Sequence, residues 1–323
     1  MRPFNRSFLR ANMQGLDQAA RTPDALLQLV RALFVPPTAR LFDPCPAGRD
    51  PAFDGLAVPW RRINYVNPPY DDVARWMAKA ASEAELGHAS VLLVPARPYT
   101  RYFADHAFGR ATHVVFLQDR VTFQGYTAPL PIPLMLVVFG AVPKDALAAP
   151  PPPFALTRLP ARLLDLGRGS RTAEDAFRVL RVQYGPFTHE ALASSSPAPR
   201  QWGRRNLVCV MDDAPGHAVA LKEFHARTPA AITVCMYHVA THTRYFCEHV
   251  VPAASELAFF VPCLVFGRGR GSRSSTSGSL VVVYGGKVMG KAKAKAKANA
   301  KAKVPTRQVC FLGKAGCTGG TFR

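Results

Sequence analysis

Hydrophobic positions in the first part of the chain recur at two different spacings. Over residues 24–34 they return every three or four positions, which predicts an amphipathic helix. Thr22 is expected as the N-cap of this helix, with Pro23 in its first turn. A second helix is predicted over residues 71–85, which begin with two aspartates at the positive end of the helix dipole.

Between and after these helices lie short apolar runs of the kind found in buried strands. The predicted strands are ARLFDPC, RINYV, ASVLLVP, THVVFLQ and LMLVVFG. Because strands and helices alternate, the sequence predicts an α/β fold with a parallel-rich sheet and helices on its faces. In such sheets the ligand crevice lies beyond the carboxyl ends of the strands.

The pattern occurs twice along the chain. Trp60 matches Trp202, the TRYF segment that ends at Phe103 matches the one that ends at Phe246, and both copies close on an apolar strand followed by glycine. The spacing between matched positions stays between 142 and 145 residues, which indicates an internal duplication. The alternative is two unrelated α/β domains of similar strand composition.

Composition divides the chain into four parts. Residues 1–142 form the first predicted domain, and the proline-rich residues 143–154 are expected to be a semi-rigid linker. Residues 155–286 form the second copy, and the Lys/Ala-rich residues 287–323 are expected to be a disordered basic tail.

The net charge of +20 and a pI near 10.2 favour a polyanionic partner, most simply nucleic acid, although an anionic membrane surface would also fit. No apolar run is long enough to cross a membrane, and the first residues lack the apolar core of a secretory signal. The seven cysteines include no CxxC pair, so no zinc site is predicted. We therefore expect an intracellular protein in a DNA-containing compartment.

The segment with the most chemical content is Asn67-Pro68-Pro69-Tyr70, which follows a predicted strand and precedes a helix. A residue before proline is held extended, and each proline removes a backbone donor. The loop therefore presents a stiff array of acceptor oxygens, suited to an –NH2 group that brings two hydrogens to one point. Accepting both hydrogens would free the nitrogen lone pair to attack a methyl electrophile, while Tyr70 stacks on the base. The alternative is a simple proline turn at a strand end.

Together with the ordered segments TPDALLQLV, FDPCPAG, VLLVPARPYTRYF and LMLVVFG, this motif resembles the phage-type (Dam-like) DNA N6-adenine methyltransferases over residues 20–140. The resemblance implies a Rossmann-like class I fold, S-adenosylmethionine as cofactor and a flipped adenine of DNA as substrate. It also implies that Asn67, Pro68, Pro69 and Tyr70 are catalytic.

The same resemblance places Thr22, Pro23, Asp43 and Cys45 on the cofactor side. The chain departs from the family pattern because no glycine-rich loop follows the RLFDPC strand. Asp43 is also compatible with a simple Asp-Pro turn, and Cys45 with a small buried residue.

Several basic residues are expected to contact nucleic acid. Arg97, Arg101 and Arg120 lie on or near the predicted catalytic edge, and they would be equally ordinary as surface ion-pair residues. The Lys/Ala-rich segment adds sequence-independent phosphate contacts, or serves only as a solubilising or targeting segment. Its candidate residues are Lys291, Lys293, Lys295 and Lys297.

The second copy has CVMD where the first has Asn-Pro-Pro-Tyr, and no acid at the position of Asp43. We expect it to be a degenerate domain that packs on the first as an internal pseudo-dimer or extends the nucleic-acid surface. A catalytically inactive nucleic-acid-binding protein that keeps the fold is the alternative to a methyltransferase. RNA adenine or a protein glutamine is a further possible acceptor.

Overall fold

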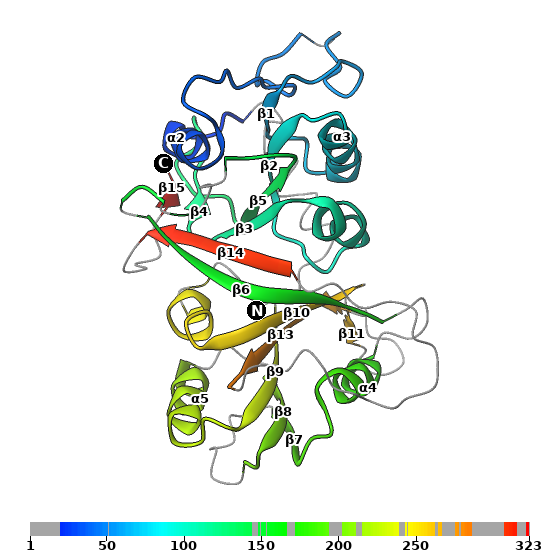
Figure 1. Cartoon of the computed structure of the whole chain (residues 1–323), viewed down its shortest axis with the longest axis vertical. Coiled ribbons are helices and arrows are strands. Elements are labelled where there is room, and N and C mark those ends of the chain that lie inside the picture. The colour runs from blue at the N-terminus through cyan, green and yellow to red at the C-terminus, as the bar shows by residue number, and fades with distance from the viewer. Residues whose placement is uncertain are drawn as a thin grey trace.

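In the computed structural model of the chain, one eleven-stranded mixed sheet runs through the molecule, with helices on both of its faces (Figure 1). The structure describes residues 20–50, 52–143, 148, 150–152, 154–166, 172–193, 202–210, 215–238, 243, 245–261, 264–266, 275–277, 279–285, 307–314 and 321–322. The α/β class predicted from the alternating pattern is therefore confirmed, with few helices relative to strands.

The elements fall into two units of similar order. The first unit contains α2 (Asp24–Phe34), β1 (Ile63–Val66), α3 (Val73–Glu85), β2 (Ala89–Pro95), the π-helix η1 (Phe103–Phe108), β3 (His113–Leu117), β4 (Arg120–Val121) and β5 (Leu134–Phe139). The second contains α4 (Ala173–Tyr184), β7 (His189–Ala193), β8 (Arg205–Val210), α5 (Pro215–Arg227), β9 (Ile232–His238), the π-helix η3 (Phe246–Val250), β10 (Ala254–Val261), β11 (Leu264–Phe266), β12 (Ser275–Ser277) and β13 (Ser279–Tyr284). Three strands lie outside this division: β6 (Phe154–Asp165), β14 (Arg307–Lys314) and β15 (Thr321–Phe322).

The strand order across the sheet is β1-β2-β5-β3-β14-β6-β10-β13-β9-β8-β7. In the first unit β1, β2 and β3 are parallel and β5 is antiparallel to its neighbours. In the second unit β8, β9 and β10 are parallel and β13 is antiparallel. Apart from the additional outer strand β7, the two units thus have the same strand order, read inward from opposite ends of the sheet.

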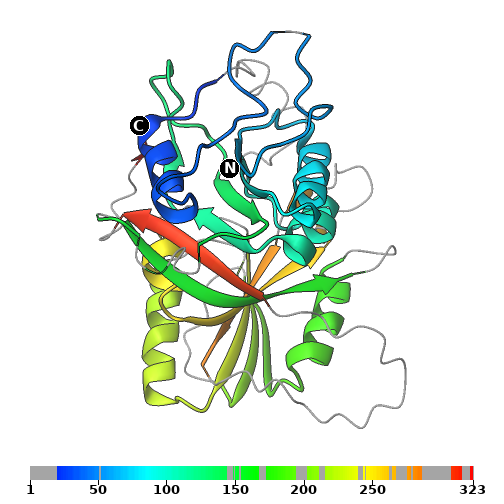
Figure 2. The same cartoon turned by 45° about the horizontal axis from the view of Figure 1, so that its top comes forward.

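Two strands join the units at the centre. β14 runs parallel to β3 of the first unit and antiparallel to β6, while β6 runs parallel to β10 of the second unit. In sequence, however, β6 follows the first unit and β14 follows the second. Each unit therefore receives its innermost strand from the segment that follows the other unit, as the green and red strands in Figures 1 and 2 show.

The prediction of a disordered tail is wrong for residues 307–314. This segment forms β14, which lies between β3 and β6. Burial of its apolar side chains stabilises this central strand; they are Val309, Cys310, Phe311 and Leu312. The four candidate lysines, Lys291 to Lys297, lie outside the described residues.

Each face of the sheet carries its own hydrophobic core. On one face α2 packs against the first unit and α4 against the second, in two separate clusters. On the other face α3, η1, α5 and η3 share one continuous cluster that spans both units. Phe116 and Phe311 stack at its centre, with ring centroids 5.2 Å apart, and Phe259 lies 5.8 Å from Phe116. No helix in the described part of the chain is long and apolar enough to cross a membrane.

Candidate functional site

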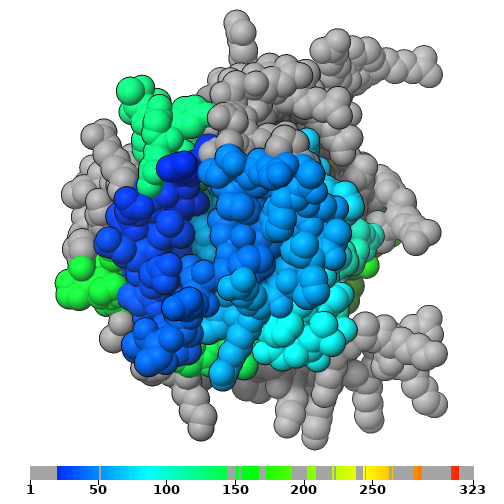
Figure 3. All heavy atoms as spheres, turned by 90° about the horizontal axis from the view of Figure 1, so that it is seen from above, coloured from blue at the N-terminus to red at the C-terminus, as the bar shows by residue number. Residues whose placement is uncertain are grey.

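The Asn-Pro-Pro-Tyr loop begins where β1 ends, at the carboxyl edge of the first unit. Phe42 forms a parallel bridge beside β1, and its carbonyl accepts a hydrogen bond from the Tyr65 amide at 2.8 Å. Of the predicted ARLFDPC strand, only this bridge forms. It nevertheless brings Asp43 to the edge that carries Asn67, so two of the predicted site residues lie on adjacent segments. Figure 3 shows the molecule from the side of β1, where residues 20–60 (blue) form much of the visible surface.

Asn67 is half-buried and held by one side of its amide. Its Nδ2 donates a hydrogen bond to the carbonyl of Ala20 at 3.2 Å. Its Oδ1 is buried and has no hydrogen-bond partner in the protein. A buried acceptor without a partner costs roughly 1–3 kcal/mol, so this oxygen is the atom of the loop best placed to gain from a donor on a ligand.

Tyr70 does not project from the loop as an exposed stacking platform. Its ring packs against the cores on both faces of the sheet, and its hydroxyl is buried without a partner. Burial raises the pKa of Tyr70 well above its ordinary value, and the nearby Tyr65 adds to this. In this state the ring is held by the two cores, and stacking on a base would require it to move.

Tyr65, which the sequence reasoning missed, lies at the centre of the site. Its hydroxyl and the Thr22 hydroxyl are 2.9 Å apart and share a hydrogen bond. Burial is the largest cause of its raised pKa, and the negative charge of Asp43 adds to it. The signal that could have identified it is its hydroxyl in the fully buried run INYV, where Asn64 is the other residue with a polar side chain.

The predicted cap of α2 is corrected by this contact. Pro23, rather than Thr22, occupies the N-cap position, and no side chain caps the helix. The Thr22 hydroxyl is turned toward the sheet because Tyr65 offers it a partner there. Thr22, Asp43 and Tyr70 all interact with Tyr65.

Asp43 has an unusual carboxyl group. Burial raises its pKa to about 6, against the lowering effects of the Cys45 amide, which donates to Oδ1 at 2.8 Å, and of Arg49. Cys45 itself is only 5% exposed and packs in the shared core on the face opposite α2. Its position matches the small buried residue rather than a cofactor contact, and burial raises the pKa of its thiol to about 11.

The three arginines differ in their surroundings. Arg97 follows β2, next to β1 and at the same edge as Asn67, and its buried Nη2 has no hydrogen-bond partner. Arg101 is exposed at the start of the helical segment that contains η1. Arg120 is exposed on β4, which pairs with β15. Only Arg97 is therefore part of the edge around Asn67.

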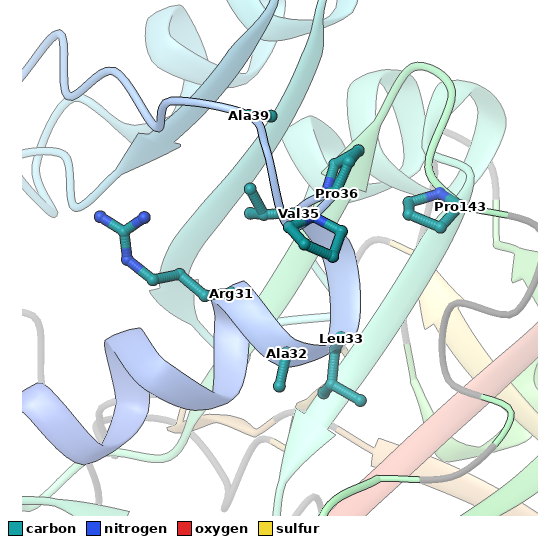
Figure 4. Close-up of a pocket in the computed structure, with 8 residues that line it drawn as sticks. Arg31, Ala32, Leu33, Val35, Pro36, Ala39 and Pro143 are labelled. Atoms are coloured by element: carbon teal, nitrogen blue, oxygen red, sulfur yellow. The ribbon is translucent and has the colours of Figure 1, made fainter.

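Two cavities of the described part of the chain lie elsewhere. One, of about 420 Å³, is at the far end of α2 from Thr22 and is lined by Arg31, Val35, Pro36 and Pro143 among others (Figure 4). The other, of about 260 Å³, lies at the amino ends of β3 and β14. No cluster of three or more His, Cys, Asp or Glu side chains suited to a metal ion occurs among the described residues.

Comparisons of the chain with protein-family models, with curated proteins and with solved structures found no significant match.

Proposed function

We propose that the chain is an S-adenosylmethionine-dependent DNA N6-adenine methyltransferase whose catalytic site is the Asn67–Tyr70 loop. The observation that carries this proposal is the Asn67 Oδ1 atom, a buried acceptor without a protein partner at the carboxyl end of a parallel strand. This edge is where open α/β sheets bind their ligands.

The hydrogen bond from Asn67 Nδ2 to Ala20 gives the amide a defined orientation. Because Nδ2 already donates to Ala20, Oδ1 is the amide atom that remains to bind a substrate amine. Accepting an N–H of the adenine amine there, with a second N–H on the carbonyl of Pro68, favours a more tetrahedral and more nucleophilic nitrogen. The two prolines hold both acceptors in place, so that little reorganisation is needed during the reaction.

The residues present fit the proposed cofactor through their chemistry. Asp43 is mainly ionised at neutral pH and would accept hydrogen bonds from the amine or ribose hydroxyls of S-adenosylmethionine. Bound there, the cofactor supplies a methyl group activated by a sulfonium. The hydrogen-bonded pair of Thr22 and Tyr65 would form the surface of the site between Asp43 and Asn67.

DNA as the substrate rests on charge and on the resemblance of the first unit. The net charge of +20 favours binding to the phosphate backbone. An adenine within a duplex must be flipped out to reach Asn67, at a cost of a few kcal/mol that basic contacts would offset.

We further infer that the two units are copies of one Rossmann-like domain. Their shared strand order supports this, and so do the equivalent π-helices η1 and η3. Gly140 and Gly285, which follow the last strand of each unit, both have positive φ angles, of 77° and 70°. The second copy lacks the Asn-Pro-Pro-Tyr motif and therefore has a supporting role.

A catalytically inactive nucleic-acid-binding protein is the second candidate. It is favoured by the buried hydroxyl of Tyr70, whose ring is not available for stacking on a base in this structure. In that case the chain would bind DNA through its positive charge alone, without binding S-adenosylmethionine.

The test is transfer of a labelled methyl group from S-adenosylmethionine to unmethylated adenine-rich DNA, with RNA and a glutamine-containing peptide as parallel acceptors. Wild type and a control variant at an exposed position, Val182→Ala, should methylate DNA, while Asn67→Ala should lose at least about a hundredfold in rate. Circular dichroism establishes that the variants are folded. Equal rates for wild type and Asn67→Ala, or no transfer to any acceptor by wild type, would overturn the proposal.

A further inference from the structure

A cleft of about 260 Å³ opens at the amino ends of β3 and β14, away from the Asn67 edge. It is lined by ten residues, including Arg158 of β6, Arg307 of β14 and His113 of β3, and none of the ten is Asp or Glu. The cleft therefore gathers the positive charges of two arginines, from β6 and β14, without an acidic residue in its wall.

The polar groups of the cleft are partly engaged by the protein. The Arg307 guanidinium donates hydrogen bonds to the carbonyls of Gly109, at 2.6 Å, and Ala111. Arg158 is exposed, and its positive charge lowers the pKa of His113, although burial is the larger cause. The Nδ1 atom of His113 is buried and has no hydrogen-bond partner in the protein.

In the second unit, Glu256 occupies the position that is equivalent to His113 in the first unit. His113 lies opposite Val138 in the β3–β5 pair, and Glu256 lies opposite Val283 in the β10–β13 pair, so the two residues hold equivalent positions. The carboxylate of Glu256 is 3% exposed and forms an ion pair with Arg162, whose Nη2 donates to it at 2.8 Å.

The last residues of α4 and α2 lie beside these two positions in the same way. At the end of α4, the Tyr184 hydroxyl donates a hydrogen bond to Glu256 at 2.7 Å. At the end of α2, the ring of Phe34 lies 6.3 Å from that of His113. In the second unit the Glu256 carboxylate neutralises the partly buried Arg162 guanidinium. In the first unit all three groups are replaced, because Cys310 on β14 holds the register position of Arg162, and a cleft lined by Arg158 and Arg307 stands there instead.

We propose that this cleft binds a small phosphate-type oxyanion, which takes the place that the Glu256 carboxylate occupies in the second unit. Arg158 and those N–H groups of Arg307 that are not bonded to the Gly109 and Ala111 carbonyls would supply the charge-assisted hydrogen bonds. The volume suits a free phosphate or the terminal phosphate of a nucleotide. The proposal is independent of the methyltransferase function, because none of its residues belongs to the Asn67 edge.

The test is calorimetric titration of the full chain, in a phosphate-free buffer of low ionic strength, with inorganic phosphate, adenosine 5′-monophosphate and adenosine. Saturable binding of phosphate to wild type is expected, and Arg158→Gln should weaken it at least about tenfold. Arg178→Gln is the matched control, because it removes one exposed positive charge on α4 and should leave phosphate affinity unchanged.

His113→Glu is the sharper variant, since it installs the carboxylate of the second unit, and it should abolish phosphate binding. If it fails to fold, Arg158→Gln decides the question alone. Binding of the monophosphate but not of adenosine identifies a nucleotide as a source of the anion, and preference for free phosphate identifies the inorganic ion. Absence of saturable phosphate binding to wild type, or equal affinity in Arg158→Gln, would overturn the proposal.

Discussion

Asn64 and Asn206 are fully buried polar residues at equivalent positions of the two units. Asn64 accepts the amide of Arg61 at 2.9 Å and donates to the Arg61 carbonyl at 2.7 Å. Asn206 accepts the amide of Gly203 at 2.8 Å and donates to the Gly203 carbonyl at 3.0 Å. In each unit one asparagine thus fixes the turn that leads into the strand preceding the candidate loop or its counterpart.

We expect Asn64→Ala and Asn206→Ala each to lower the free energy of unfolding by roughly 1–3 kcal/mol, because each leaves buried backbone groups of the turn without a partner. Urea unfolding followed by circular dichroism measures the change. Ser82→Ala, at an exposed position on α3, is the control and should stay within about 0.5 kcal/mol of wild type. A loss at Asn64 with none at Asn206 would contradict the equivalence of the two turns.

Asp43 predicts a dependence of stability on pH. Its pKa is about 6 in the folded protein and 3.8 in an unperturbed state, so between about pH 4 and 6 the folded protein holds a proton that the unfolded chain has released. The stability that this group contributes falls as the pH rises through that window. We expect Asp43→Asn to raise the free energy of unfolding by up to about 3 kcal/mol at pH 7. At pH 3.5 the variant and wild type should coincide; an equal gain at both pH values would exclude the carboxylate as the cause.

At this scale the sequence predicts the candidate residues better than their contacts. The order of strand, proline loop and helix places Asn67 and Asp43 at one edge, because both follow segments that run side by side. It could not show that the ring of Tyr70 is enclosed, or that Thr22 binds Tyr65 instead of capping α2, because these depend on side chains that pack from distant parts of the chain.

Among the elements, β14 is the one whose position differs most from expectation. The helix over residues 24–34 and the strands β1, β2, β3 and β5 could be read from hydrophobic spacing, since each carries a local pattern. The strand over residues 307–314 follows a lysine-rich segment. The prediction assigned both to one disordered tail on the basis of the lysine-rich composition, although the strand itself contains an apolar run. Its partners, β3 and β6, lie far away in sequence, and no local pattern predicts such pairing.

We expect Phe311→Ala to lower the free energy of unfolding by about 3–5 kcal/mol, because it removes a fully buried ring that stacks on Phe116 and leaves a cavity at the centre of the shared core. Chemical denaturation measures it. Gln308→Ala in the same strand is exposed and should change stability by no more than about 0.5 kcal/mol. A small loss at Phe311 would mean that β14 contributes little to joining the units.

For the molecule as a whole, the shared core predicts one cooperative unfolding transition. On one face of the sheet, side chains of both units and of β14 form a single cluster, so neither unit keeps its packing when the other opens. Tryptophan fluorescence reports mainly on Trp60 and Trp76 in the first unit, whereas far-ultraviolet circular dichroism reports on both units. The two signals should give the same denaturant midpoint, and separate midpoints would show that the units unfold independently.

The placement of β14 also determines when the protein can finish folding during its synthesis. The inner edge of β3 emerges from the ribosome early, but the strand that covers it, β14, follows only after the whole second unit has been translated. Until then the nascent chain presents an unpaired, strongly apolar strand edge, which is prone to aggregation. Production of the protein should therefore depend on chaperones more than its size suggests, and premature termination before residue 307 would release a chain that cannot complete its sheet.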